Sequence, residues 1–392
     1  MTDQTTTIPK GWKITTLGNQ LKVGRGSSPR PIQDYLSDHG IPWVKIADAS
    51  ASQTRYIVKT KQCIKEEGRS TSVKIGDLIV SNSATPGIPK LMGIDACVHD
   101  GWLVFSDYVD LDKLYLYYFF LDYRRTLAQS ASGTVFVNLQ TDIVRNIELS
   151  LPPLPEQRAI AAVLSTLDDK IELLREQNKT FEATAQAIFK EWFVNFNFPG
   201  STGKMIDSEF GEIPEGWRVN KLGNEIKIVY GKNLPTESLT KSGYTVFGAN
   251  GQIGFHNKFI YEKPQVLVSC RGEASGKVNI SLPESFVTNN SLVLEIADDS
   301  DLNFCFLKFF SLNNDYTNFV TGSAQPQITI DSLKNCDLLL PPKKIMDFFN
   351  VTVEPMDKKQ LSNFYQIQTL STFRDTLLPK LIKGEVRVEG FN

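Results

Sequence analysis

The chain has 392 residues, of which 41% are hydrophobic and 22% are charged. This composition is typical of folded globular proteins and excludes a disordered chain, and the length favours two or more domains. The formal net charge is −2, so the chain as a whole does not attract a polyanion. Any contact with nucleic acid must therefore depend on local clusters of basic residues.

The sequence shows no sign of secretion, of a membrane span or of a metal site. Its first residues lack a signal peptide, and no apolar run approaches the roughly 18 residues that cross a bilayer. The five cysteines form no Cys-x-x-Cys pair and the three histidines have no paired spacing. We therefore expect a cytoplasmic protein with buried free thiols and no bound metal.

Two segments of the first half are rich in basic residues. Every charged residue between Asp3 and Asp34 is basic, and from Arg55 to Lys74 six basic residues face only two acidic ones. Such segments are most often solvated surface, but they also provide candidate phosphate contacts.

An internal repeat organises the chain. Residues Ile8–Gln20 match Ile213–Glu225 at seven of thirteen positions, and Asp142–Pro153 match Asp331–Pro342 at six of twelve. The segments between these conserved ends differ widely. A duplicated frame therefore encloses two divergent interiors.

Both interiors predict mixed α+β domains. Short β-branched and aromatic runs such as Tyr244–Phe247, Val266–Ser269 and Ser291–Leu294 are separated by Gly, Asn and Pro, as strands are. Each interior ends in one predicted helix, near Leu111–Gln129 and Asp301–Asn313.

A long helix is predicted after the first Leu-Pro-Pro motif. Apolar residues from Ile160 to Trp192 recur at alternating steps of four and three, the 3.5-residue period of a coiled-coil seam. Roughly 38 residues at ~1.5 Å each give a rod of about 55 Å, whose seam requires a partner helix. Asn178 lies in this seam and either specifies the register or faces an unpacked gap.

The C-terminal segment is the expected partner helix. Apolar residues from Val353 to Leu381 have compatible spacing, and Gly384 provides a stop. Pro355 predicts either a kink or a late start of this helix.

Four motifs in this order resemble type I restriction-modification specificity subunits. They are the Ile-Pro-x-Gly-Trp-x-x-x-x-Leu-Gly opening of each half, Leu149–Arg158, Ala187–Phe193 and Arg374–Glu385. The resemblance spans the whole chain and implies two target-recognition domains held apart by antiparallel helices, each reading one half of a split DNA site. Lys343-Lys344-Ile345 departs from the family's Pro/Glu-Glu-Gln, which leaves the packing of the second helix open.

The fold class that follows is α+β, with two target-recognition domains of mixed α/β structure in a pseudo-twofold repeat, separated by two long antiparallel coiled-coil spacer helices. The expected boundaries are residues 1–152 for the first domain, 153–198 for the first spacer, 199–341 for the second domain and 342–392 for the second spacer.

The sequence contains no recognisable catalytic motif. It lacks the Asn/Asp-Pro-Pro-Tyr/Phe loop with which adenine methyltransferases hold a flipped base. Gly272–Val278 resembles a phosphate-binding loop, but one residue is missing between its glycines and Val278 replaces the hydroxyl residue that would hold Mg²⁺. We expect a tight loop between strands there and no catalytic residue. The alternatives are a stand-alone DNA-acting enzyme with an unrecognised motif and a scaffold that binds only protein.

The resemblance also implies partners and cofactors. Expected partners are double-stranded DNA, two methyltransferase subunits and restriction/translocase subunits, with no membrane. We expect no cofactor on this chain; the partner subunits would use S-adenosylmethionine, ATP and Mg²⁺.

Candidate DNA contacts are polar or basic residues in loop-like segments. In the first domain they are Arg25, Arg30, Lys45, Arg55, Arg69 and Asn82. In the second domain they are Lys232, Asn250, Gln252, Lys258, Arg271, Lys277, Gln325 and Gln327. The candidates for docking the methyltransferase subunits are Phe189, Trp192 and Phe193, with a core role for Trp192 as the alternative.

Overall fold

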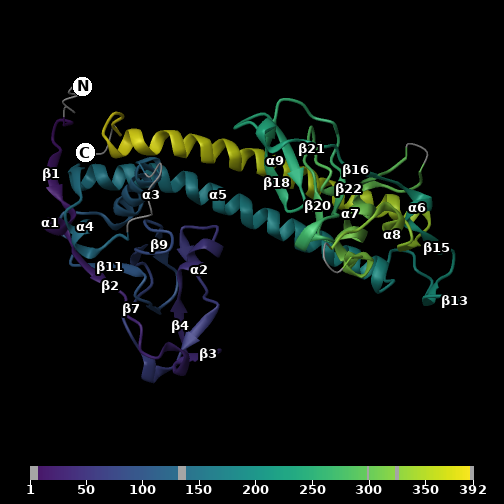
Figure 1. Ribbon diagram of the computed structural model, residues 1–392, viewed down its shortest axis with the longest axis horizontal. Helices are drawn as coiled ribbons and strands as arrows, with labels where there is room; N and C mark the ends of the chain where they lie inside the picture. Colours follow the sequence, from purple (N-terminus) through teal and green to yellow (C-terminus); the bar gives the residue numbers. More distant parts are fainter. Residues whose placement is uncertain (1–7, 131–137, 298–299, 323–325, 389–392) are drawn as a thin grey trace. The chain divides into compact units, whose positions relative to one another are not determined.

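The computed structural model describes residues 8–130, 138–297, 300–322 and 326–388, with side chains described only to residue 125 in the first of these ranges. The chain divides into two compact units. The first unit comprises the residues up to Glu176 together with those from Asn363 onward, and the second comprises Gln177–Ser362. Two long helices, α5 (Leu154–Phe189) and α9 (Lys343–Ile382), each contribute to both units (Figure 1).

The first unit contains two five-stranded sheets and one short strand pair. The central sheet has the order β2 (Lys22–Arg25), β11 (Trp102–Ser106), β8 (Leu78–Ser81), β9 (Pro89–Met92), β5 (Tyr56–Ile57). The outer sheet has the order β3 (Leu36–Ser37), β6 (Gln62–Ile64), β4 (Ile41–Val44), β10 (Ala96–Val98), β7 (Ser72–Val73). The strand pair is β1 (Lys13–Thr16) with β12 (Glu148–Leu151), and the helices are α1 (Leu17–Gln20), α2 (Ile46–Ala51), α3 (Lys113–Ser130) and α4 (Thr141–Arg145).

The second unit repeats this plan with shorter sheets. Its central sheet has the order β16 (Lys227–Tyr230), β22 (Ser291–Glu295), β19 (Val266–Ser269), β20 (Val278–Ile280). Its outer sheet has the order β18 (Gly251–His256), β17 (Tyr244–Gly248), β21 (Phe286–Val287). The remaining elements are the hairpin β13 (Met205–Ser208) with β14 (Gly211–Pro214), the pair β15 (Arg218–Lys221) with β23 (Asp337–Leu340), and the helices α6 (Leu222–Glu225), α7 (Phe304–Asn313) and α8 (Ile330–Leu333).

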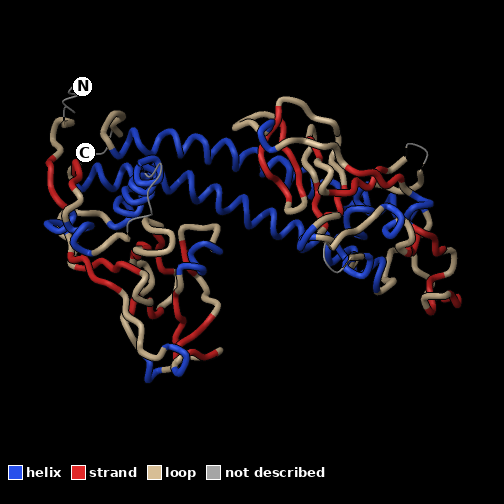
Figure 2. Tube along the Cα trace, in the orientation of Figure 1, coloured by secondary structure: helices blue, strands red, loops and turns tan. Residues whose placement is uncertain are grey.

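The strand connections confirm the internal repeat and its divergent interiors. Strands β2, β11, β8 and β9 have the order that β16, β22, β19 and β20 have, and β4 pairs in parallel with β10 as β17 does with β21. The predicted strands Tyr244–Phe247, Val266–Ser269 and Ser291–Leu294 are confirmed, and so are the two helices expected near Leu111–Gln129 and Asp301–Asn313. Figure 2 shows the strands of each unit in red beside its helices in blue.

Each central sheet lies between a helical layer and the outer sheet, which explains why its middle strand is apolar on both faces. All four residues of β8 are buried. Leu78 and Val80 pack in the cluster that contains α3, whereas Ile79 packs in the cluster of the outer sheet. In β19, Val266 and Leu267 divide between the two clusters of the second unit in the same way.

The repeated Leu-Gly-Asn sequence is fixed by a close backbone approach. A Cβ atom on Gly18 would lie 3.1 Å from the carbonyl oxygen of Arg145, and one on Gly223 would lie 3.2 Å from that of Lys334. The short helices α1 and α6 can therefore contact the segments that lead into β12 and β23 only with glycine at these positions.

The two long helices run antiparallel within each unit, and their apolar seams form part of each core. In the first unit Ile160 and Leu164 of α5 share a core cluster with Leu378 and Leu381 of α9. In the second unit Phe189 of α5 shares one with the first turns of α9. The coiled-coil seam predicted from the 3.5-residue period is thus confirmed.

The two open questions about the long helices are settled in the second unit. Asn178 donates its amide to the carbonyl oxygen of Gln360 at 3.3 Å, and Gln360 donates to that of Asn178 at 2.9 Å. The polar seam position is therefore paired across the helices and faces no unpacked gap. The late start considered for the second helix is wrong, because α9 continues through Pro355 from Lys343.

Candidate nucleic-acid interface

A framework of backbone hydrogen bonds closes one end of the central sheet in the first unit. Gly26, directly after β2, donates to the carbonyl oxygen of Trp102 at 2.8 Å. Asn82, directly after β8, donates to Gly101 at 2.9 Å and accepts from Leu139 at 3.0 Å. Four chain segments therefore meet at the sheet end, although they are far apart in sequence.

The second unit builds the same framework from different residues. Gly231, directly after β16, donates to the carbonyl oxygen of Ser291 at 3.0 Å. Cys270, directly after β19, donates to Asn290 at 3.0 Å and accepts from Ile328 at 3.0 Å. We call these equivalent regions, residues 25–30, 82, 99–101 and 138–142 in the first unit and 231–232, 270–271, 289–290 and 326–328 in the second, the two sheet ends.

Three of the predicted DNA contacts converge at the first sheet end, around Asp100. Arg25 and Asn82 both donate to the carbonyl oxygen of Asp100, at 2.7 and 3.1 Å. Arg30 reaches its carboxylate at 3.4 Å, and Ser28 donates to the same group at 3.0 Å. Burial alone would raise the pKa of Asp100, but the hydrogen bond from Ser28 helps to hold it below its ordinary value. Asp100 thus fixes Arg25 through its carbonyl oxygen and Arg30 through its carboxylate, and both arginines stay exposed.

The first sheet end is hollowed. A cavity of about 230 Å³ is lined by Arg25, Asn82, Asn138, Leu139, Gln140, Thr141 and Asp142. The amide oxygen of Asn82 is buried and accepts no hydrogen bond from the described residues. Guanidinium and amide groups that line a hollow are the side chains that read base edges.

The predicted contacts at the second sheet end occupy equivalent positions. Lys232 follows Gly231, and Arg271 forms an isolated antiparallel bridge with Gln327. All three side chains are exposed. Gln325 lies outside the described residues.

Four predicted contacts lie beside or between the sheets. Lys45 directly follows β4, whereas Asn250 lies two residues after the end of β17. The equivalent backbone positions are Val44 and Gly248, whose carbonyl oxygens accept from Trp102 and Ser291. Lys45 is bonded to the side-chain oxygen of Gln62. Gln252 lies on β18 and Lys258 lies two residues after its end, and both are exposed.

The remaining two surface candidates have no place at a sheet end. Arg69 forms an exposed ion pair with Glu66 at 2.6 Å, which holds the pKa of Glu66 below its ordinary value. Lys277 lies in Gly272–Val278, which connects the antiparallel strands β19 and β20. The tight loop expected there is confirmed.

Arg55 is not available for DNA, and its prediction as a contact is corrected. Its side chain is only 4% exposed. It forms ion pairs with Asp169 and Glu172 of α5, the latter at 3.6 Å, and donates to the hydroxyl of Tyr118 at 3.4 Å. Burial alone would lower the pKa of Arg55, but these three partners raise it. Arg55, although it lies in a basic segment of the sequence, therefore binds the domain to α5.

The aromatic docking candidates are also corrected. Phe189 is 4% and Phe193 7% exposed, and their rings lie 5.0 Å apart in the core of the second unit. Phe193 also lies 5.1 Å from Phe306 of α7. Trp192 is half-buried and lies 5.4 Å from Phe348 of α9, which is 50% exposed. Of the three candidates, only Trp192 keeps an exposed edge.

The sequence analysis missed Asn138 and Gln140, which line the first sheet end. Asn138 precedes Leu139 as the candidate Gln327 precedes Ile328. The signal was available, because both residues lie within four positions of the repeated block that begins at Asp142.

The described residues contain no group of three or more His, Cys, Asp or Glu side chains arranged to hold a metal ion. No described helix is both long enough and apolar enough to cross a membrane. The five cysteines are free, and all except Cys63 are buried.

Comparison with known proteins places this two-repeat architecture in one class. A family model described as the type I restriction modification DNA specificity domain matches residues 9–183 and 214–369, and the chain belongs to this family. It is accordingly the DNA-sequence-recognition subunit of a type I restriction-modification system, a non-catalytic class of subunit.

Individual relatives agree with this assignment. The chain is 28% identical to the type I restriction enzyme MjaIX specificity subunit of Methanocaldococcus jannaschii, over 97% of this chain and 95% of that protein. It is 25% identical to the HindI specificity subunit of Haemophilus influenzae, over 68% of this chain and 74% of that protein. The crystal structure of an S subunit from M. genitalium has the same fold, with a TM-score of 0.57, 17% identity and coverage of 95% of this chain and 96% of that one.

Proposed function

We propose that each unit reads one half of a bipartite, asymmetric DNA site at its sheet end. The observation that carries this proposal is that the same backbone framework holds different side chains in the two units. Arg25, Arg30 and Asn82 lie at the first sheet end, and Lys232, Arg271 and Gln327 at the second. Arginine pairs best with guanine, and Asn or Gln with adenine, so different sets select different bases.

The chain acts together with subunits that supply the chemistry. Two methyltransferase subunits and the restriction/translocase subunits are the proposed partners, and S-adenosylmethionine, ATP and Mg²⁺ are the cofactors those partners use. The complex acts on cellular DNA in the cytoplasm. A net charge of −2 supports shared binding, because the partners must add many of the phosphate contacts.

The test is a map of methylated adenines in cells that carry this chain and its partners. We expect two blocks of specified bases, separated by a gap of fixed length and free sequence. Exchange of residues 1–152 for those of another family member should change one block alone. The matched exchange of residues 199–341 should change the other. A palindromic motif without a gap, or one exchange that alters both blocks, would contradict the proposal.

A further inference from the structure

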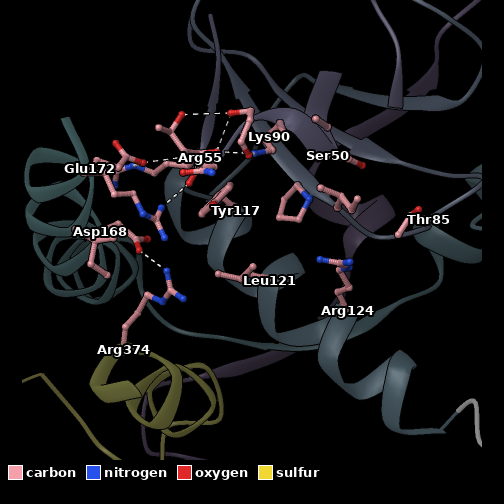
Figure 3. A pocket seen from close by; sticks show the side chains of 18 residues that line it. Ser50, Arg55, Thr85, Lys90, Tyr117, Leu121, Arg124, Asp168, Glu172 and Arg374 are labelled. Carbon is pink, nitrogen blue, oxygen red and sulfur yellow. Dashed lines mark hydrogen bonds and ion pairs between the residues drawn. The ribbon is translucent and has the colours of Figure 1, made fainter. Parts of the chain in front are cut away.

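The first unit contains a second, larger cavity, of about 400 Å³, away from the sheet end. Its walls come from residues 49–55, the start of β9, and the helices α3, α5 and α9 (Figure 3). Five cationic side chains line it against two carboxylates, Asp168 and Glu172; the cations are Arg55, Lys90, Arg124, Arg175 and Arg374.

Two of the five cations are neutralised by carboxylates of the long helices. Arg55 is paired with Asp169 and Glu172. Arg374 is paired with Asp168 at 2.6 Å and with Asp375 at 2.7 Å. These two arginines fasten the walls and offer little charge to a ligand.

The other three cations have no carboxylate in ion-pair contact among the described residues. Lys90 is 7% exposed and donates to the carbonyl oxygens of Ser52 and Thr54. Arg175 donates to the carbonyl oxygen of Gln53 at 2.6 Å. The guanidinium of Arg124 points toward the interior of the cavity in Figure 3, with no interaction drawn to it.

Uncompensated positive charge inside a cavity is unfavourable, because burial removes the water that would solvate it. Burial lowers the pKa of Lys90 to about 8; Glu172 opposes this shift, and the charges of Arg124 and Arg175 add to it. A bound anion would relieve all three cations together. Phosphate suits such a group, because its oxygens accept charge-assisted hydrogen bonds from Arg and Lys side chains.

The cavity does not belong to the common frame of the two units. By strand pairing, Lys90 of β9 faces Ile79 of β8, whereas the equivalent residue of β20, Asn279, faces Leu267 of β19. Asn279 is neutral and donates to the carbonyl oxygen of Ala249 at 3.2 Å. The buried cation is therefore a feature of the first unit that the repeat does not require.

We propose that this cavity binds a phosphate group through Lys90, Arg124 and Arg175. The group belongs either to the backbone of bound DNA or to a free phosphate compound such as a nucleotide. Binding of a DNA phosphate rests on the proposed function, whereas binding of a free phosphate compound does not.

The first arm of the test uses the purified full chain with inorganic phosphate and with ATP. We expect saturable binding and a rise in the thermal midpoint beyond that given by chloride at equal ionic strength. The double variant Arg124→Gln/Arg175→Gln should lose this response. The control Lys59→Gln/Lys170→Gln removes two exposed charges of the same unit outside the cavity and should keep it. Lys90→Met provides a second variant if the arginine variant does not fold.

The second arm measures DNA binding by the chain together with its methyltransferase subunits. If the phosphate is that of DNA, the cavity variant should bind every sequence several-fold more weakly, with a salt slope shallower by about one for each lost contact and an unchanged methylation motif. If the phosphate belongs instead to a free compound such as a nucleotide, the cavity variant should lose ATP binding and keep its affinity for DNA.

Two outcomes would overturn the proposal. One is the absence of saturable phosphate or ATP binding combined with equal DNA affinity of the variant and the control. The other is an equal response to acetate, which would assign the cavity to an acidic side chain of a protein partner. Neither outcome would alter the methylation map, so failure here is distinct from failure of the proposed function.

Discussion

At the scale of single residues, the long helices carry an aspartate at equivalent positions of the two units, Asp168, which is buried, and Asp357, which is partly buried. Asp168 of α5 accepts from Arg374 of α9 at 2.6 Å and from Tyr118 at 2.8 Å. Asp357 of α9 accepts from Lys308 of α7 at 2.9 Å. The same carboxylate thus fastens helix to helix in the first unit and helix to domain in the second.

Asp168→Ala should destabilise the first unit by about 1 to 3 kcal/mol, because it removes the acceptor of the buried Tyr118 hydroxyl and one of the two carboxylates that pair with Arg374. The side chain of Asp168 is only 7% exposed, which makes this loss larger than that of a surface pair. Asp347→Ala, which breaks the exposed pair with Lys343, should cost at most about 0.5 kcal/mol. Urea unfolding midpoints measure both, and equal effects would show that the buried pair contributes no more than an exposed one.

Lys90 predicts a pH dependence whose sign follows from its lowered pKa. Below pH 8 the amine is charged in both the folded and the unfolded chain, and the folded chain bears the cost of burying the charge. Between pH 8 and the ordinary pKa of 10.5, the folded chain has lost the proton that the unfolded chain retains, so stability rises with pH.

We therefore expect the wild-type chain to gain about 2 kcal/mol relative to Lys90→Met between pH 7 and roughly pH 9.5. Urea unfolding in phosphate-free buffer measures the difference. The charged groups that act on the amine are Glu172, Arg124 and Arg175. The exposed control Lys59→Met should show no such trend, and a flat difference for Lys90→Met would mean that the amine is solvated.

At the scale of elements, the start of each long helix shows how the repeat tolerates a changed motif. Gln157 of α5 is fully buried, donates to the carbonyl oxygens of Asp110 and Pro152, and accepts from the backbone of Asp112. Met346 takes this place in α9, where Asn303 donates to its carbonyl oxygen at 2.9 Å. The sequence Lys343-Lys344-Ile345, which departs from the family motif, is therefore accompanied by a different contact at the start of α9, the hydrogen bond from Asn303 to Met346.

Pro355 lies inside α9, where it cannot donate to the carbonyl oxygen of Val351. Both side chains are exposed, so its ring contributes little packing. Pro355→Ala should stabilise the second unit by on the order of 1 to 3 kcal/mol. The exposed change Lys359→Ala in the same helix should alter the free energy of unfolding by less than about 0.5 kcal/mol. Thermal and urea midpoints check both; a loss of stability on Pro355→Ala would assign a packing role to the ring.

The aromatic pair Trp192 and Phe348 is the candidate docking surface that remains after Phe189 and Phe193 are assigned to the core. Trp192→Ala/Phe348→Ala should weaken assembly with the methyltransferase subunits several-fold while both units stay folded. Phe210→Ala, which truncates a phenylalanine 52% exposed on the hairpin β13–β14, should leave assembly unchanged. Native mass spectrometry gives the stoichiometry, and an unchanged complex in the double variant would argue against this surface.

At the scale of the whole molecule, α5 and α9 each contribute to both units, so their length is the proposed determinant of the gap in the DNA site. Inserting one heptad into each helix, beside Asn178 and Gln360, keeps the seam in register and adds about 10 Å, or roughly three base pairs. The methylation map should show both blocks unchanged and a longer gap. Altered blocks with an unchanged gap would contradict this division of roles.

The sequence by itself determined the repeat, the fold class and the long helices. These features are local or periodic: Ile160 and Leu164 recur with the period of a seam, and the repeated Leu-Gly-Asn marks a contact that only glycine permits. The family assignment followed from the same motifs. Most strands could also be located, because apolar runs such as Val266–Ser269 are bounded by turn residues.

Only the tertiary structure decided which of the candidate residues share a site. Arg25, Arg30 and Asn82 meet at Asp100 because separate strands end at one edge of a sheet, whereas Arg55, from an equally basic segment, meets carboxylates of α5. Charge and polarity are properties of a residue, but burial and partners are set by segments that are distant in sequence. The cavity around Lys90 depends in the same way on loop, strand and helix residues that no local pattern connects.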